Sequence, residues 1–161
     1  MGAYTVDWRL CAFNQLTTLD LYELLQLRAQ VFVVEQACAF QDLDGADAAA
    51  HHLQGHAGQQ LLAYARCLGP GVKFNEASIG RVVTRSDARG QGLGHLLVKQ
   101  AITALGERWG DPAIRIGAQA RLKHFYQCHG FADVGRPYVE DGIDHLEMVR
   151  QPQGNQEPMH D

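Results

Sequence analysis

Residues 77–105 read ASIGRVVTRSDARGQGLGHLLVKQAITAL and change character once along their length. Residues 77–84 are rich in β-branched side chains, which predicts a strand. From Leu93 onward apolar side chains recur every four residues, which predicts an amphipathic helix that Gly110 ends. Between them, residues 89–94 read RGQGLG. The segment therefore predicts a strand, a glycine-rich loop and a helix in direct succession.

The glycine-rich loop is placed to bind an anion. The first amides of a helix have no partners within the helix and point outward, and the helix dipole adds partial positive charge there. Glycines let the phosphates of a ligand approach the backbone closely. Arg85 and Arg89 would add two full positive charges. The sequence therefore predicts a pyrophosphate-containing ligand, and a glycine-rich turn without a ligand is the alternative.

Two common phosphate-binding motifs do not fit this loop. A Walker A loop requires Gly-x-x-x-x-Gly-Lys-Ser/Thr, and the chain contains no such string. A dinucleotide-binding loop requires Gly-x-Gly-x-x-Gly, but His95 stands where the last glycine would be. The 161-residue chain also ends too soon after Gly94 for the second half of a dinucleotide-binding fold. The ligand must therefore be sought in another class.

The flanking segments predict a mixed α/β domain over residues 1–150, with no internal repeat. A helix should begin at Thr17 or Thr18, with Arg28 on its apolar face. The other expected elements are strands at 4–13, 51–54, 61–68, 113–118, 131–134 and 146–149 and a short helix over 122–126. Residues 151–161 are polar and predict a disordered tail.

Composition excludes several functional classes. Fourteen Lys and Arg against eighteen Asp and Glu give a net charge of −4, which argues against general affinity for nucleic acid. No apolar run approaches the roughly 18 residues of a membrane span, and the first ten residues lack a signal-peptide core. The four cysteines form no C-x-x-C pair. We therefore expect a cytoplasmic protein with reduced thiols.

Neither the histidine cluster nor the acidic loop predicts a metal site. The cluster is His51, His52 and His56, and the glycine-rich sequence around its last member indicates a turn rather than a helix that could present two ligands. The acidic loop lacks the glycine offset and the downstream glutamate of a calcium loop. We expect no bound metal, and we expect Asp42, Asp44 and Asp47 to lie in a solvated loop.

Two motifs resemble the GCN5-related N-acetyltransferase (GNAT) family. Arg89-x-x-Gly92-x-Gly94 resembles the family's Arg/Gln-x-x-Gly-x-Gly/Ala signature, and it too follows a strand and opens a helix. Residues 125–131, FYQCHGF, resemble its Phe-Tyr-x-x-x-Gly-Phe segment. The order of elements matches over residues 3–150. The strings RAQVFVVEQ (28–36), GAQ (117–119) and YVEDGIDH (138–145) resemble the ElaA-type branch, although Asp144 stands where that branch typically has Pro.

The resemblance implies a fold and a reaction. The fold would be a central, mostly antiparallel twisted sheet, flanked by helices and splayed at the acetyl-CoA site between strands 77–84 and 113–118. The reaction would move the acetyl group of acetyl-CoA, the cosubstrate, to a primary amine by direct attack in a ternary complex. By position, the pantetheine arm would pair with the backbone of Val82 and Val83. The pyrophosphate would bind the amides of Arg89, Gly90, Gln91, Gly92, Leu93 and Gly94.

The resemblance also implies catalytic candidates. Tyr126 matches a tyrosine that often lies near the CoA sulfur and would protonate the departing thiolate. A tyrosine pKa of about 10 and a thiol pKa of about 8.5 make full transfer uphill by roughly 2 kcal/mol, so hydrogen-bond stabilisation is an alternative, and simple packing is another. The attacking amine must lose a proton. Glu35, Glu140 and His145 are candidates for that base, and Glu35 could equally pair with Arg28.

The acceptor and the assembly stay open at this stage. Five acidic residues could attract a cationic amine or could form a solvated rim; they are Asp42, Asp44, Asp47, Glu140 and Asp141. A small amine, a peptide N-terminus and a protein lysine all fit. A non-catalytic acyl-CoA-binding module and a plain interaction domain are the alternatives to an enzyme. Exposed strand edges in the first hairpin or the C-terminal pair could support a homodimer.

Overall fold

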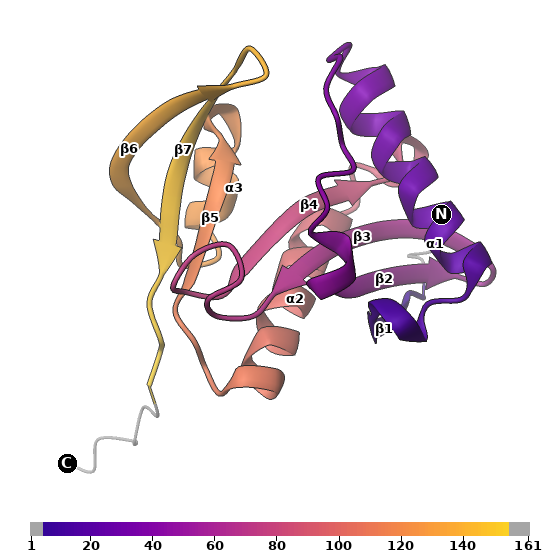
Figure 1. Cartoon of the computed structure of the whole chain (residues 1–161), viewed down its shortest axis with the longest axis horizontal. Helices are drawn as coiled ribbons and strands as arrows, with labels where there is room; N and C mark the ends of the chain where they lie inside the picture. Colours follow the sequence, from indigo (N-terminus) through magenta and orange to yellow (C-terminus); the bar gives the residue numbers. More distant parts are fainter. Residues whose placement is uncertain (1–4, 155–161) are drawn as a thin grey trace.

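A computed structural model describes residues 5–154 and arranges them as two antiparallel sheets with helices on their faces (Figure 1). The strands are β1 (Asp7–Ala12), β2 (His51–Ala57), β3 (Gln60–Leu68), β4 (Ser78–Thr84), β5 (Ile114–Gln119), β6 (Ala132–Glu140) and β7 (Ile143–Arg150). The helices are α1 (Thr18–Arg28), its π-helical continuation η2 (Ala29–Glu35), α2 (Leu93–Trp109) and α3 (Lys123–Gln127).

The two sheets join at a single parallel bridge. Their strand orders are β1-β2-β3-β4 and β5-β7-β6. Ala77 N–H donates to Ala113 O at 3.1 Å, and Arg115 N–H donates to Ala77 O at 2.8 Å. Beyond this bridge β4 and β5 form no ladder, and Figure 1 shows the second sheet inclined away from β4. The expected mostly antiparallel sheet, splayed between these two strands and flanked by helices, is confirmed.

A β-bulge lies in β4 beside this opening. Tyr64 of β3 pairs with Val83, but Arg66 pairs with Gly80, so β4 carries one extra residue in this interval. Arg81 lies in the bulge with a φ of 50°, in the left-handed region that few non-glycine residues adopt. A bulge takes backbone groups out of the ladder and increases the local twist. It therefore favours the divergence of β4 from β5.

Helix α2 covers one face of the first sheet. Leu97, Ala101 and Leu105, spaced by four as the sequence predicts, have no exposed surface. They belong to one core with side chains of both sheets, such as Ile79 of β4 and Ile116 of β5. Burial of each such leucine stabilises the fold by about 1.5–3 kcal/mol. The helix ends at Gly110, as expected, and thereby bridges the region where the sheets part.

Helix α1 packs on the opposite face of the first sheet. Its N-terminus is a capping box in which Thr17 Oγ1 accepts from Asp20 N–H at 3.0 Å and Thr17 N–H donates to Asp20 Oδ2 at 3.1 Å. Leu24 and Leu27 pack with Tyr64 of β3 in a second, smaller core. The expected helix start is confirmed, and the helix continues as η2 to Glu35.

Several strands are longer than expected. β2 extends to Ala57, and the last two strands run over 132–140 and 143–150 rather than 131–134 and 146–149. Nearly every residue of β6 is exposed, so its sequence has no apolar alternation that could mark its length. Residues 155–161 of the expected tail lie outside the described residues. Among residues 5–154, no helix combines the length and apolar character needed to cross a bilayer.

The expectation of a solvated acidic loop is wrong for two of its three aspartates, while Asp44 is exposed as expected. Asp42 and Asp47 are each 9% exposed. Arg28, on the apolar face of α1, has no exposed surface and donates from Nε to Asp42 Oδ2 at 2.9 Å and from Nη1 to Asp47 Oδ1 at 2.7 Å. A buried arginine requires such carboxylate partners, and the loop supplies them.

Two further arginines complete this Arg–Asp cluster, which comprises Arg28, Arg66, Arg81, Asp42, Asp44 and Asp47. Arg66 of β3 donates from Nη2 to Asp44 Oδ2 at 2.7 Å and from Nη1 to Asp47 Oδ1 at 3.1 Å. Arg81 of the bulge donates from Nε to Asp42 Oδ1 at 2.8 Å. The cluster is electrically balanced and ties α1, the acidic loop, β3 and β4 together.

Replacing Arg28 tests the role of the cluster. Arg28→Gln leaves two buried carboxylates without their main partner, so we expect a loss of about 3–5 kcal/mol in the free energy of unfolding. The control is Arg9→Gln, because the Arg9–Asp20 ion pair is 4.0 Å long and Arg9 is 60% exposed, and it should lose less than about 1 kcal/mol. Urea denaturation at pH 7 measures both. Equal losses would contradict a stabilising cluster.

The difference in unfolding free energy between wild type and Arg28→Gln should depend on pH. Burial favours the neutral acid of Asp47, but hydrogen bonds and charge from Arg28 and Arg66 outweigh that effect and lower its pKa. A lowered carboxylate pKa contributes stability that is complete above the ordinary pKa of about 3.9 and is lost as the pH falls toward the lowered value. The gap between wild type and Arg28→Gln should therefore narrow below about pH 4.

Candidate active site

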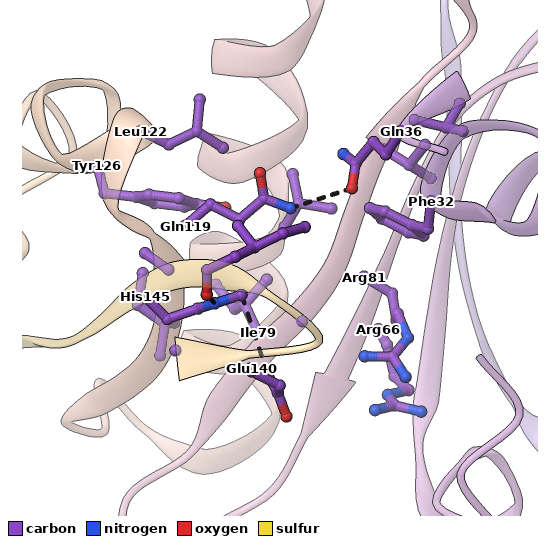
Figure 2. Close-up of a pocket in the computed structure, with 18 of the residues that line it drawn as sticks. Phe32, Gln36, Arg66, Ile79, Arg81, Gln119, Leu122, Tyr126, Glu140 and His145 are labelled. Atoms are coloured by element: carbon purple, nitrogen blue, oxygen red, sulfur yellow. Dashed lines mark hydrogen bonds and ion pairs between the residues drawn. The ribbon is translucent and has the colours of Figure 1, made fainter. Parts of the chain in front are cut away.

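A cavity of about 550 Å³ lies where β4 and β5 part. Its walls come from η2, β4, β5, α3 and the β6–β7 hairpin, and Figure 2 shows their side chains directed toward a common space. Most of the residues singled out from the sequence line it, namely Glu35, Val82, Val83, Arg89, Gly94, Tyr126 and His145. Gly90, Gln91 and Gly92 are exposed outside the cavity, and Leu93 is buried in the core.

The backbone of β4 is more accessible from the gap between β4 and β5 than its side chains are. Val82 packs against the core under α2, whereas Val83 is 4% exposed and packs against the core under α1. The two side chains therefore leave β4 on opposite faces of the sheet. The unpaired edge of β4 therefore presents the peptide groups of Val82 and Val83. These are the groups with which an added strand would pair.

The glycine loop has the backbone geometry of an anion cradle. Gly90 and Gly92 have φ values of 87° and 76°, which strain any other residue. A Cβ built on either glycine would meet nothing within 4 Å, so the space beside them is open. Gly92 caps α2 without a side-chain hydrogen bond, and this 17-residue helix directs the positive end of its dipole at the loop.

The two arginines of the loop are not a source of unpaired positive charge. Arg89 holds Glu35 with both arms of its guanidinium, each N–O distance being 2.8 Å, and Nη2 also donates to Thr84 O at 3.0 Å. Arg85 donates from Nε to Asp87 Oδ1 at 2.9 Å. The expectation that both add full charge to the loop is therefore corrected. The attraction for an anion comes mainly from backbone amides and the helix dipole.

Glu35 is occupied by this ion pair. The hydrogen bond from Arg89 is the main cause of its lowered pKa, which makes the carboxylate a weaker proton acceptor. The alternative pairing with Arg28 does not occur, because Arg28 binds Asp42 and Asp47. The Glu35–Arg89 pair instead joins the end of η2 to the glycine loop.

Tyr126 is a largely buried residue that lines the cavity. The residue is 8% exposed, and its ring packs edge-on against Phe125 and Phe131 at centroid distances of 5.0 and 5.8 Å. Figure 2 shows the ring pointing from α3 toward the cavity beside Gln119. Burial raises the pKa of the phenol to about 12, an effect that the charge of Arg121 opposes. The hydroxyl is therefore a hydrogen-bond donor that gives up its proton reluctantly.

His145 lines the cavity beside Glu140. Its Nδ1 lies 2.7 Å from Ile143 O, which assigns the ring proton to Nδ1 because a carbonyl oxygen can only accept. Its Nε2 lies 3.9 Å from Glu140 Oε2. The ring stacks on Tyr138 with centroids 5.3 Å apart.

A hydrogen bond across the cleft was not expected from the sequence. Gln119 Nε2 of β5 donates to Gln36 Oε1, just after η2, at 3.2 Å, and Arg121 Nε donates to Gln119 Oε1 at 3.0 Å (Figure 2). The bond links the two walls of the cavity. Gln119 belongs to the string GAQ that resembles the ElaA-type branch, and this was the only signal that could have singled it out.

Within the histidine cluster, His52 has a structural role. His52 is fully buried, with Nδ1 2.6 Å from Tyr64 Oη and Nε2 2.9 Å from Asp47 O. Both ring nitrogens are thus engaged with the acidic loop and β3. Over residues 5–154, no three His, Cys, Asp or Glu side chains gather closely enough to hold a metal ion.

Comparison with known proteins gives a consistent result. A family model described as an acetyltransferase (GNAT) domain matches residues 29–151. Protein ElaA of Escherichia coli is 39% identical over 148 residues, which cover 91% of this chain and 97% of ElaA. Two solved structures are close. An acyl-CoA N-acyltransferase from Pseudomonas aeruginosa has a TM-score of 0.87 and 45% identity over 91% of this chain and 99% of its own. The crystal structure of E. coli ElaA has a TM-score of 0.85 and 38% identity over 91% and 100%.

Proposed function

Because this chain belongs to the GNAT acetyltransferase family, we propose that it moves the acetyl group of acetyl-CoA to a primary amine by direct attack in a ternary complex. One observation carries the proposal: β4 and β5 part beyond the Ala77–Ile114 bridge and leave a cavity of about 550 Å³. The glycine loop flanks this cavity, and Tyr126 and His145 line it.

The chain would hold acetyl-CoA mainly through its backbone. We propose that the unpaired edge of β4 at Val82 and Val83 bonds the pantetheine arm as an added strand would. The amides of residues 89–94 would bind the pyrophosphate, as their open approach and the helix dipole favour. When bound, acetyl-CoA supplies a thioester, whose acyl carbon is the electrophile. The parting of the strands leaves room for that thioester near Tyr126.

Replacing Gly92 tests the cradle. Gly92→Ala adds a methyl group and backbone strain where the phosphates would approach, so we expect the dissociation constant for CoA to rise about tenfold, as the loss of one charged hydrogen bond would do. The control is Gly58→Ala in the β2–β3 turn, where φ is also positive at 60° and a Cβ also meets nothing within 4 Å. Both variants should lose similar stability. Calorimetry showing equal CoA affinity in the two variants would contradict the assignment.

Tyr126 is best suited to stabilise the departing thiolate by a hydrogen bond. Complete proton transfer from a phenol with a pKa of about 12 to a thiolate with an ordinary pKa of about 8.5 is uphill by about 5 kcal/mol. A preorganised donor in a buried site can stabilise developing negative charge without releasing its proton. The proposed role is therefore donation to the sulfur as the carbon–sulfur bond breaks.

Tyr126→Phe removes that donor and little else. We expect kcat to fall about 10²-fold, whereas KM for acetyl-CoA changes by less than about threefold, because the lost bond forms as charge develops. Tyr22→Phe is the matched control, since Tyr22 is 65% exposed on α1. Thiol release at saturating acetyl-CoA provides the measurement. Unchanged turnover of Tyr126→Phe would remove the proposed role.

We propose His145 as the base that accepts the proton of the amine. An alkylamine is mostly protonated at neutral pH and must become neutral to attack. His145 Nε2 is the acceptor nitrogen and faces the cavity, and Glu140 can attract the ammonium group beside it. Glu35 stays the weaker candidate, because Arg89 engages both of its oxygens.

Two substitutions separate these candidates. His145→Gln should lower kcat about 10²-fold near pH 7, and its activity should recover as the pH rises, because solution hydroxide then deprotonates the amine. Glu35→Gln should mainly raise KM for acetyl-CoA, since Arg89 loses the partner that fixes it beside the loop. pH profiles of kcat and kcat/KM measure both. If Glu35→Gln instead abolished kcat at unchanged KM, Glu35 would be the base.

A thiol-release screen against amines, amino acids and peptides tests the overall function. The proposal predicts CoA release that depends on one class of acceptor, together with a rise in melting temperature on addition of acetyl-CoA. A rise in melting temperature without thiol release from any acceptor would favour a non-catalytic acyl-CoA-binding module. If acetyl-CoA neither raised the melting temperature nor released thiol, only the plain interaction domain would remain.

The remaining features follow from this function. We propose that residues 1–150 act as one acetyltransferase domain in the cytoplasm, where free thiols persist. All four cysteines are free, in keeping with that compartment. Homodimer formation through an exposed strand edge stays a prediction.

A further inference from the structure

The end of the cavity away from α2 carries opposite charges on its two walls. Lys73, on the loop between β3 and β4, lines it together with Arg66 and Arg81. Glu140 and Asp141, at the turn between β6 and β7, line the facing wall. The walls meet where Cys38 Sγ lies 3.5 Å from Asp141 O. We refer to these five charged residues as the bipolar mouth.

The acidic loop does not make this mouth anionic. Attraction of a cationic amine by Asp42, Asp44 and Asp47 was one expectation from the sequence. The Arg–Asp cluster neutralises these three carboxylates with three arginines. The negative charge that remains directed at the acceptor comes from Glu140 and Asp141. Arg66 and Arg81 are balanced within that cluster, so Lys73 is the cation that a purely cationic acceptor would face opposite the acidic turn.

Lys73 and Arg66 differ in what they offer to a ligand in the cavity. Lys73 Nζ lies 5.3 Å from the centre of the Phe74 ring and has no carboxylate within 4.0 Å among residues 5–154. Arg66 is 3% exposed, and its Nε has no hydrogen-bond acceptor among the described residues, although Nη1 and Nη2 bind Asp44 and Asp47. A buried donor without an acceptor destabilises the protein by about 1–3 kcal/mol. Arg66 Nε is buried away from the cavity, so of these two groups Lys73 is the one that an anionic ligand group can reach.

The pKa of Lys73 depends on other charged groups of the bipolar mouth. Lys73 remains exposed to solvent, and partial desolvation by the surrounding wall is the main cause of its lowered pKa. Arg66 and Arg81 also lower this pKa, whereas Glu140 and Asp44 raise it. The cationic wall and the acidic turn are therefore within electrostatic reach of one another, across a space that a small acceptor would enter.

We propose that the acceptor is a zwitterionic amino compound, with its amine at Glu140 and His145 and its carboxylate at Lys73. The inference rests on the proposed acetyltransferase function and names the substrate class of that same site. Glu140 attracts the ammonium group, His145 Nε2 takes its proton, and the carboxylate orients the molecule so that the amine faces the thioester. An amine without a carboxylate leaves Lys73 without an anionic partner.

The test compares acceptors that differ only in the carboxylate. Each amino acid is assayed by thiol release beside its carboxamide and its decarboxylated amine, as with phenylalanine, phenylalaninamide and phenethylamine. We expect kcat/KM at least about tenfold higher for the favoured amino acid than for its amide, as one hydrogen bond to a charged group provides. The amide is matched in size, so the ratio reports charge.

Substitution of Lys73 locates the carboxylate site. Lys73→Gln should reduce the preference for acid over amide to within about threefold, while kcat/KM for the amide changes by less than about twofold. Lys99→Gln is the matched control, because Lys99 is exposed on α2 and does not line the cavity. Lys73 belongs to an exposed loop, so this variant should fold, and an unchanged melting temperature verifies it.

The outcomes separate the two proposals. Equal activity with amide and acid, or a preference that Lys73→Gln leaves intact, would overturn the zwitterionic acceptor and leave the acetyltransferase function standing. Turnover of protein lysines or of peptides alone would do the same. Absence of thiol release with every amine would overturn the acetyltransferase function itself.

Discussion

Asp42 holds Arg28 with one carboxylate oxygen and Arg81 with the other, at N–O distances of 2.9 and 2.8 Å, and the geometry of the cleft depends on this double ion pair. Arg28 fixes α1 and hence η2, while Arg81 is the left-handed residue of the β4 bulge. Left-handed backbone costs a non-glycine residue roughly 1–2 kcal/mol, and a hydrogen bond to a charged group offsets about as much. One aspartate thus supports both the helical wall and the strand that turns away from β5.

Electrostatic attraction in the cleft comes from the backbone at one end and from charged side chains at the other. At the α2 end, Arg89 is engaged by Glu35, so amides and the helix dipole supply the attraction for phosphate. At the other end, the Arg–Asp cluster cancels internally and leaves Lys73 facing Glu140. We therefore propose that the cosubstrate and the acceptor are recognised by different interactions. The first depends on backbone geometry and the second on a few side-chain charges.

Local pattern was enough to predict the parts of the fold that depend on neighbours in sequence. The spacing of Leu97, Ala101 and Leu105 marks the buried face of α2, and the two glycines at 92 and 110 mark its ends. Pairings between distant segments were not predictable. Arg28 meets partners 14 and 19 residues away, and without them an acidic loop can only be interpreted as solvated. The bulge at Arg81 and the exposed length of β6 depend on sheet register, which residue type does not encode.

Amide hydrogen exchange with and without CoA tests most directly whether the gap between β4 and β5 receives the cosubstrate. The account predicts that CoA slows exchange in two separate segments, residues 81–84 on the edge of β4 and residues 90–95 at the start of α2. Strand β1, none of whose residues line the cavity, serves as an internal reference that should not change. Slowed exchange confined to other segments, or no change in either predicted segment at saturating CoA, would contradict the account.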